Sequence, residues 1–166
     1  GGGHANYLGN EVYTWSGATG QWARGSLPSY VNGSGYIPDN SGPQSAHTYD
    51  NNVYLPVNKM FLTLGGGAQY QGGPTLWWNG TQTVRTDPWV WDPAKANPNL
   101  VGGSNGSGWD PSVPGGNMWT SRNASAVGNF PGSFSGGATA YIQENGKDVV
   151  YVSTELNGSG FPWLYR

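Results

Sequence analysis

Short runs of apolar and β-branched residues alternate with glycine-rich segments along this chain. The clearest example lies at 138–155, where two such runs flank Asn145-Gly146. An Asn-Gly pair favours a type I′ turn, because both residues tolerate the positive φ angles that this turn requires. The pattern therefore predicts strands over 138–143 and 148–154, joined as an antiparallel hairpin.

The same pattern occurs upstream, where runs at 47–56 and 60–65 are joined by Val57-Asn58-Lys59. Both predicted hairpins lead into a polar segment and then a short aromatic strand, at 89–92 and at 163–166. A matching piece near the start runs from 11–15 through Gly17-Ala18-Thr19-Gly20 into Gln21-Trp22. Recurrence over tens of residues is typical of propellers and solenoids.

The predicted strands contain nearly continuous apolar runs rather than strict alternation. Such runs are typical of strands that are covered on both faces. The six residues that we expect to be buried between sheets are Tyr54, Leu62, Tyr141, Tyr151, Val90 and Trp91.

Composition supports a chain made of strands and turns. Its 166 residues include 29 Gly and 12 Pro, which disfavour long helices. The 9 Trp and 10 Tyr supply bulky apolar surface that a disordered chain would lack. We therefore expect an all-β fold of packed antiparallel sheets.

Charge and cysteine content exclude several classes of function. Only 10% of the residues are charged and the formal net charge is −2, so we expect no nucleic-acid partner. No apolar run approaches the roughly 20 residues that span a bilayer. Cysteine is absent, which removes disulfides, zinc-thiolate sites and thiol catalysis. Low charge with abundant Asn, Gly, Ser, Thr and Trp favours an extracellular, cell-surface or virion location.

The glycine, tyrosine and tryptophan positions resemble the Kelch repeat of β-propellers. The residues that carry this resemblance at the start are Gly1-Gly2-Gly3, Asn10-Glu11-Val12-Tyr13, Thr19 and Trp22. A similar set extends from Ser45 through Gly65-Gly66-Gly67 to Trp89-Val90-Trp91-Asp92-Pro93, and 136–166 resembles the front of a third repeat. The second repeat has no clear fourth-strand Trp after Asp92, and 154–158 replaces the diglycine of the third.

The resemblance implies a partial propeller of two to three Kelch-like blades. The end of one blade is expected at 1–30, a second blade at 43–100, a loop insertion at 101–134 and the start of a third blade at 135–166. Propellers close with about four to eight blades. We therefore expect a longer parent protein, with several chains sharing one ring or an open array of blades as the alternatives.

Candidate catalytic and metal-binding residues are few. Some Kelch-like propellers are copper-radical oxidases resembling galactose oxidase, which need a Tyr cross-linked to a Cys that this chain lacks. His4 and His47 are the only histidines. Asp50 and Asp110 match no calcium-loop spacing. We expect no metal and no cofactor, and we assign no catalytic residue.

Tryptophans in predicted loops are the remaining functional candidates. Trp77 and Trp78 lie between glycine-rich turns, and Trp109 and Trp119 lie in the predicted insertion. We predict that these four bind a glycan or a protein partner, with local packing beneath their own loops as the alternative.

The expected function is thus a non-enzymatic scaffold that binds through its loops. One alternative is a structural assembly component, such as a phage decoration or tail protein or a surface-filament subunit. The other is a galactose-oxidase-like or carbohydrate-active enzyme whose catalytic residues lie outside this segment.

Overall fold

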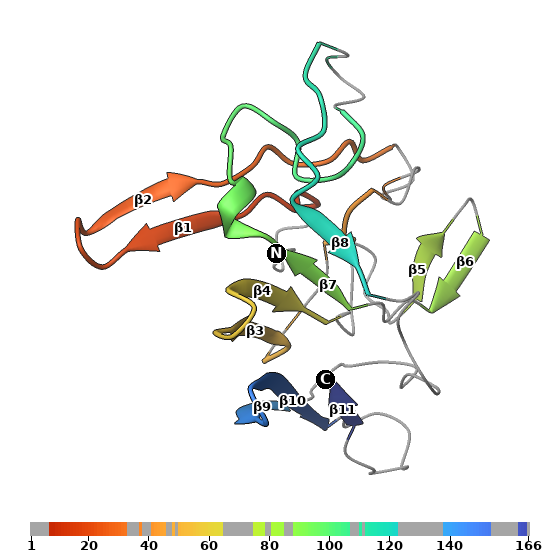
Figure 1. The fold of residues 1–166 in the computed structure, drawn as a ribbon. Helices are drawn as coiled ribbons and strands as arrows, with labels where there is room; N and C mark the ends of the chain where they lie inside the picture. The colour runs from red at the N-terminus through yellow and green to blue at the C-terminus, as the bar shows by residue number, and fades with distance from the viewer. Residues whose placement is uncertain are drawn as a thin grey trace.

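A computed structural model of the chain describes residues 7–32, 37, 41–45, 48, 50–64, 75–78, 81–84, 88–106, 110, 112–122, 138–153 and 163–165, with only the backbone described for 75–78, 81–84 and 163–165. The described residues form antiparallel sheets and one 3-10 turn, η1 (Pro93–Lys95) (Figure 1). The all-β prediction is confirmed.

The largest sheet has four strands in the order β3 (Asn52–Leu55), β4 (Met60–Thr63), β7 (Trp89–Trp91) and β8 (Trp119–Ser121). A second sheet has the order β11 (Trp163–Tyr165), β10 (Lys147–Ser153) and β9 (Ala138–Glu144). Two further hairpins stand apart from these sheets. They are β1 (Tyr13–Ser16) with β2 (Gln21–Arg24), and β5 (Thr75–Trp78) with β6 (Thr81–Val84).

Both of the hairpins predicted most directly from turn chemistry are present. β9 and β10 pair through Asn145 and Gly146, whose φ angles of 51° and 76° are those that a type I′ turn needs. β3 and β4 also pair, and Lys59 closes their turn at a φ of 55°. β3 begins at Asn52, later than predicted; positions 47 and 49 lie outside the described residues.

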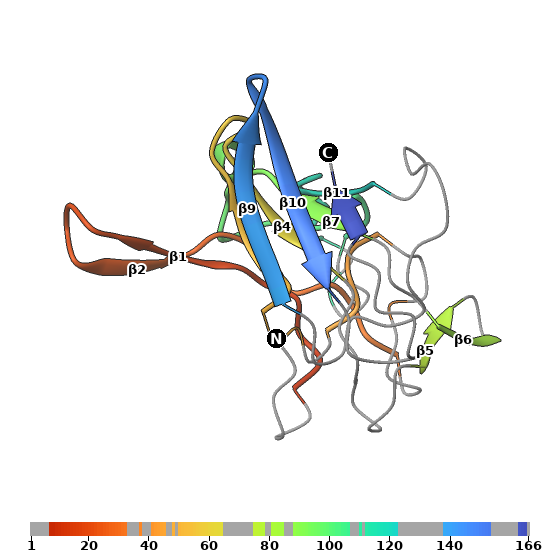
Figure 2. The ribbon, with the colours of Figure 1, turned by 90° about the horizontal axis from the view of Figure 1, so that it is seen from below.

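An apolar cluster joins the four-stranded sheet to the β9–β10 hairpin. Leu62 and Val90 face Val150 and Val152 of β10, and all four are almost fully excluded from solvent. Burying such side chains stabilises the folded state by about 1.5–3 kcal/mol each. In Figure 2 the β9–β10 hairpin lies alongside β4, which matches this packing.

A buried carboxylate holds one end of this sheet-to-sheet contact. Asp148, 2% exposed, accepts hydrogen bonds from the backbone N–H groups of Val57 and Asn58 at 3.0 and 2.8 Å. The Asn58 side-chain amide and the Tyr141 hydroxyl also donate to it, at 2.6 and 2.9 Å. Four donors therefore replace the water that the charge loses on burial.

The other end of the contact is held by Asp50 and Thr139. The Thr139 N–H donates to the Asp50 carboxylate at 2.9 Å, and the Thr139 hydroxyl donates to the Asp50 backbone oxygen at 2.6 Å. Polar contacts at both ends fix how the β9–β10 hairpin lies on β3, with the apolar cluster between them.

Half of the burial predictions hold. Leu62, Val90 and Trp91 are buried, whereas Tyr141 is only partly buried. The prediction is wrong for Tyr54 and Tyr151, which are exposed. Tyr54 follows Val53 on the opposite face of β3, and Tyr151 lies between two core valines of β10. Period-2 alternation turns both rings away from the shared core.

Two predicted loops contain strands. Trp77 and Trp78 end strand β5, so their assignment to a loop is wrong. Trp119 starts β8, which pairs with β7 as the fourth strand of the large sheet. The segment predicted as a loop insertion therefore contains a strand, which carries Trp119. Within the described residues, no helical segment has the length and hydropathy needed to cross a membrane.

We predict that Asp148→Asn destabilises the fold by about 2 kcal/mol at neutral pH, because an amide cannot accept all four hydrogen bonds. Burial alone would raise the pKa of Asp148, but the bonds from Val57, Asn58 and Tyr141 outweigh it and hold the pKa below its usual value. A depressed pKa stabilises the fold above about pH 4, and this is lost as the pH falls through the folded-state pKa.

Urea unfolding of both proteins between pH 7 and pH 3 measures this effect, and the two stabilities should converge in acid. Asp110→Asn is the matched control. The exposed Asp110 carboxylate accepts from the Ser112 backbone and hydroxyl, so this change should leave the stability nearly unchanged. Equal stabilities of the wild type and Asp148→Asn at neutral pH would contradict the assignment.

Candidate functional site

The four predicted binding tryptophans do not form a common exposed face in the described structure. Trp119 is only 6% exposed and lies in the core. Trp77 and Trp78 are neighbours on β5, where only the backbone is described, and Trp109 lies outside the described residues. The prediction of exposure is wrong for Trp119.

Trp119 belongs to an aromatic row across the four-stranded sheet. Cross-strand pairing places Phe61 opposite Trp91 and Trp91 opposite Trp119. The rings of Phe61 and Trp119 approach to 6.2 Å between centroids at an interplanar angle of 58°, a tilted arrangement that aromatic pairs favour. Trp89, Met118 and Trp119 pack with Trp91 as a second buried cluster.

Glycine lets the covering backbone approach this row closely. A Cβ on Gly25 would lie 2.7 Å from the Trp91 ring, and one on Gly102 would lie 2.9 Å from the Trp119 ring. The buried Asn10 side chain fixes the covering segments by donating to the Pro43 oxygen and accepting from the Ser29 N–H. This aromatic face is therefore part of the core.

A different aromatic face is exposed, on the β1–β2 hairpin. The register pairs Tyr13 with Arg24 and Trp15 with Trp22. Because paired residues share a face and alternate residues along a strand do too, these four side chains lie on one side. Tyr13, Trp15 and Trp22 are 54%, 57% and 70% exposed. We call these three rings the aromatic platform.

Backbone hydrogen bonds explain how the platform is held. The Gly25 N–H donates to the Val12 oxygen at 2.7 Å. The backbone N–H and C=O groups of residues 12 and 14 therefore point toward β2. Trp15 and Trp22 consequently occupy a non-hydrogen-bonded pair, the position at which side chains of antiparallel strands lie closest. Aromatic pairs at such positions contribute roughly 0.2–1 kcal/mol, so the two tryptophans support each other.

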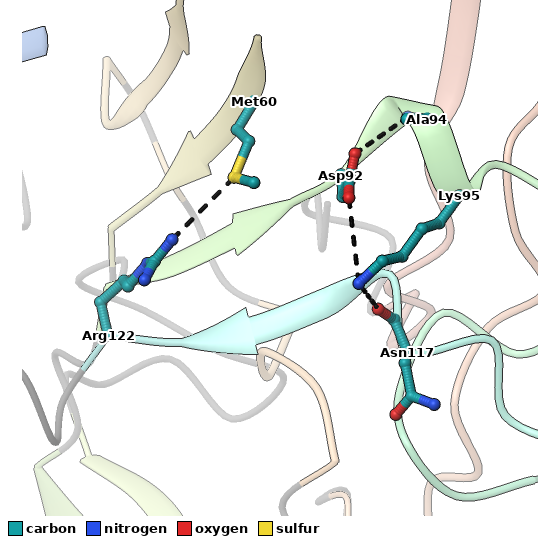
Figure 3. A network of polar contacts seen from close by, with 6 residues as sticks. All are labelled: Met60, Asp92, Ala94, Lys95, Asn117 and Arg122. Carbon is teal, nitrogen blue, oxygen red and sulfur yellow. Dashed lines mark hydrogen bonds and ion pairs between the residues drawn. The ribbon is translucent and has the colours of Figure 1, made fainter. Parts of the chain in front are cut away.

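The length of the connecting loop contributes to the difference between the covered and the exposed aromatic face. β7 and β8 are joined by a long segment that η1 begins and that packs over the Trp91 side of the sheet. Asp92 accepts from the Ala94 N–H at 3.0 Å at the start of this segment. Lys95 donates to the Asn117 oxygen at 3.1 Å, and this second bond ties the two ends of the segment together (Figure 3).

By contrast, β1 and β2 are joined by the four residues Gly17–Gly20, with Gly20 at a φ of 66°. This turn closes through the Gly20 N–H and the Ser16 oxygen at 2.7 Å. So short a connection cannot fold back over the rings. The hairpin projects from the rest of the molecule in both Figure 1 and Figure 2.

The platform carries little charge. Arg24 is the one charged residue from Tyr13 to Arg24, and its guanidinium donates to the Pro98 oxygen at 3.0 Å. At the base of the hairpin the Tyr7 hydroxyl donates to Glu11 at 2.6 Å; burial, together with this bond to a carboxylate, raises the pKa of Tyr7 well above its usual range. Glu11, two residues before Tyr13, is thus hydrogen-bonded to Tyr7.

No catalytic or metal-binding constellation appears in the described part of the chain. Asp148 is buried, but its role is structural, since it accepts four hydrogen bonds. Within the described residues, no three potential metal-ligating side chains gather. His4 and His47 lie outside the described residues.

The sequence contains a signal for the platform, although none of its three rings is among the binding residues that the sequence predicts. Tyr13 and Trp15 alternate with Thr14 and Ser16, which is the period-2 pattern of a strand with one apolar face. The pattern predicts an apolar face correctly. Whether another segment covers that face depends on tertiary packing.

We predict that Trp119→Ala and Trp22→Ala have very different effects on stability. Removing buried Trp119 leaves a cavity and should cost about 3–5 kcal/mol, whereas removing exposed Trp22 should cost less than about 1 kcal/mol. Thermal and urea unfolding measure both values. Similar losses for the two variants would show that the platform is not exposed, or that Trp119 is not in the core.

Acrylamide quenching of tryptophan emission tests the same difference without a large change in volume. Trp22→Phe should remove a strongly quenched component of the emission, and Trp119→Phe should remove a protected one. The opposite assignment would contradict the described burial of these two rings.

Comparison with known proteins identifies no relative: no family model, no curated protein and no solved structure matches this chain. The resemblance to Kelch repeats therefore stays a prediction that rests on the residues themselves.

Proposed function

We propose that this chain is a non-enzymatic, propeller-type scaffold that binds a glycan on the aromatic platform of the β1–β2 hairpin. The observation that carries the proposal is the exposure of Tyr13, Trp15 and Trp22 on one face of a projecting hairpin. Large aromatic rings are usually covered in folded proteins, and an exposed group of them marks an interaction site.

Size favours a glycan over a protein as the ligand of this face. A stable protein interface uses roughly 20–30 residues on each side. The platform consists of three rings on a ribbon of two four-residue strands. A few sugar rings can cover such a surface, because each pyranose presents an apolar C–H face to an aromatic ring while its hydroxyls remain in water.

Charge favours a neutral glycan. The single cation of the hairpin, Arg24, already donates to the Pro98 oxygen. An acidic polysaccharide would need several cations to replace its counterions, and the chain carries only 7 Lys and Arg in total. Binding is therefore expected to depend weakly on salt.

Two observations support the propeller-type scaffold. The four-stranded sheet is an antiparallel meander, and it packs face to face on the β9–β10 hairpin through apolar side chains. Propellers stack such sheets around an axis. The low charge and the aromatic platform together favour an extracellular, cell-surface or virion location.

Titration with neutral linear oligosaccharides, followed by tryptophan emission, tests the proposal. Gluco-, xylo-, manno- and chito-oligosaccharides are the probes. Binding by any of them should weaken by about 30-fold in Trp22→Ala, which corresponds to about 2 kcal/mol. Gln21→Ala is the matched control, because Gln21 is exposed on the opposite face of the same strand.

Equal weakening by Gln21→Ala and Trp22→Ala would contradict the assignment of the ligand to the aromatic face. If no oligosaccharide binds and a folded protein binds through the same rings, the glycan proposal is wrong and the platform is a protein-binding site. A circular-dichroism spectrum of each variant confirms that the sheets remain folded.

A further inference from the structure

Arg24 lies on the same face of the β1–β2 hairpin as the aromatic platform. The register pairs it with Tyr13, and it follows Trp22 by two residues on the same strand. Like Trp15 and Trp22, Tyr13 and Arg24 form a non-hydrogen-bonded pair, in which the side chains start close together. This face therefore has a row of two tryptophans and, about 7 Å further along the strands, a row of a tyrosine and an arginine.

The other polar side chains of these two strands lie on the opposite face. Alternation places Thr14, Ser16 and Gln21 there, and the Thr14 hydroxyl donates to the Ala23 oxygen at 3.4 Å. Stacking on an aromatic ring recognises the flat C–H face of a sugar but not the arrangement of its hydroxyls. Apart from the polar edges of the rings themselves, Arg24 is thus the side chain of these strands that can recognise hydroxyls on the platform.

A segment distant in sequence holds the Arg24 guanidinium in place. Its Nη2 donates to the Pro98 oxygen at 3.0 Å, and the adjacent Asn97 N–H donates to the Gly25 oxygen at 2.8 Å. The Asn97 side chain accepts from the Asn99 N–H at 3.0 Å, which closes a local turn around Pro98. The acceptor for Arg24 is therefore tied to the residue that follows Arg24, and less side-chain freedom is lost when a ligand binds.

Most of the guanidinium donors are not used by this contact. Arginine has five N–H donors in a rigid planar fork, and the bond to the Pro98 oxygen accounts for one. Arg24 is exposed, and no carboxylate of the described residues forms an ion pair with it. Two parallel N–H groups of such a fork match two oxygens that lie side by side. On a neutral sugar, hydroxyls on adjacent carbons supply such a pair.

The shape of the platform favours an extended glycan. The two rows follow each other along the hairpin, so a ligand that contacts both must run along the strands. A β-1,4 linkage joins sugars through equatorial bonds and gives a straight chain whose units present flat C–H faces. The linkage uses C1 and C4, so the hydroxyls at C2 and C3 stay free in every internal unit of a glucan or a xylan. A chitin chain carries an acetamido group at C2 and lacks this pair of hydroxyls.

We infer that Arg24 is the specificity-determining residue of the platform and that the ligand is a β-1,4-linked glycan with free hydroxyls at C2 and C3, a glucan or a xylan. The inference rests on the glycan binding proposed above. One sugar stacks on Trp15 and Trp22, and the next lies over Tyr13. There the Arg24 guanidinium donates to the C2 and C3 hydroxyl oxygens. The aromatic rings supply most of the affinity, and the fork selects among chains that stack equally well.

Titration with xylo-, gluco- and chito-hexasaccharides, followed by tryptophan emission, tests the inference. All are β-1,4-linked and present flat C–H faces to the rings. The wild type should bind the xylo- and gluco-hexasaccharides about tenfold more tightly than the chito-hexasaccharide, which is the effect of one hydrogen bond to a charged group. Lysine keeps the charge and the aliphatic stem but has no planar fork, so Arg24→Lys should reduce this preference to about twofold or less.

A purely structural role of Arg24 predicts a different result. If the side chain only braces the base of the hairpin through Pro98, Arg24→Lys weakens the binding of every sugar equally and leaves the preference unchanged, which would overturn the inference. Arg122→Lys is the matched control, because it makes the same replacement next to β8 in the four-stranded sheet. It should leave every affinity unchanged.

Trp22→Ala separates this inference from the proposed function, because loss of the exposed ring should weaken the binding of every sugar together. If Trp22→Ala weakens binding but the wild type shows no preference against the chito-hexasaccharide, glycan binding on the platform stands and the role of Arg24 is wrong. If neither the xylo- nor the gluco-hexasaccharide binds, the inference is wrong, whether or not the platform binds another glycan.

Discussion

The buried carboxylate of Asp148 is the interaction on which the arrangement of the two larger sheets depends. A charge that is 2% exposed is tolerated only because its four hydrogen-bond donors replace its lost hydration. Two of these donors are backbone N–H groups in the β3–β4 turn, so the charge requires that turn and the β9–β10 hairpin to meet in one geometry. The apolar cluster around Leu62 and Val150 supplies the buried apolar surface of this contact, and the carboxylate fixes how the two sheets are aligned.

Two strand pairs of the same kind have different surroundings in this molecule. β7–β8 and β1–β2 share a hydrogen-bond phase and a cross-strand tryptophan pair, yet Trp119 is core and Trp22 is surface. Part of the difference lies in the connection between the two strands of each pair, and part in the segment around Gly25, which also packs on the Trp91 ring. A long connection, whose two ends are joined by the Lys95–Asn117 hydrogen bond, helps to cover one face, whereas a four-residue turn leaves the other bare. Loop length thus contributes to whether an aromatic face becomes part of the core or remains exposed.

Local chemistry made the hairpins predictable. Asn145-Gly146 determines a turn type by its φ angles, and the β-branched residues around it form strands whatever covers them. Trp119 shows where prediction from local sequence fails. Its strand has only three residues within a glycine-rich segment, too few for a period to be recognised, and it forms because β7 offers an edge to pair with. The candidate tryptophans were chosen by their position in predicted loops, and that criterion could not separate a short strand from a loop.

The sequence by itself determined the all-β class, the positions of the turns and the alternation that gives β1 an apolar side, because each depends on neighbouring residues and on φ preferences. Only the tertiary structure decided which apolar sides are covered. Tyr54, Tyr151, Trp15 and Trp22 are large aromatic residues of a kind that cores also contain, and they remain exposed because no segment of the described chain reaches their face. Burial depends on contacts between segments distant in sequence, and the pattern within one strand carries no record of them.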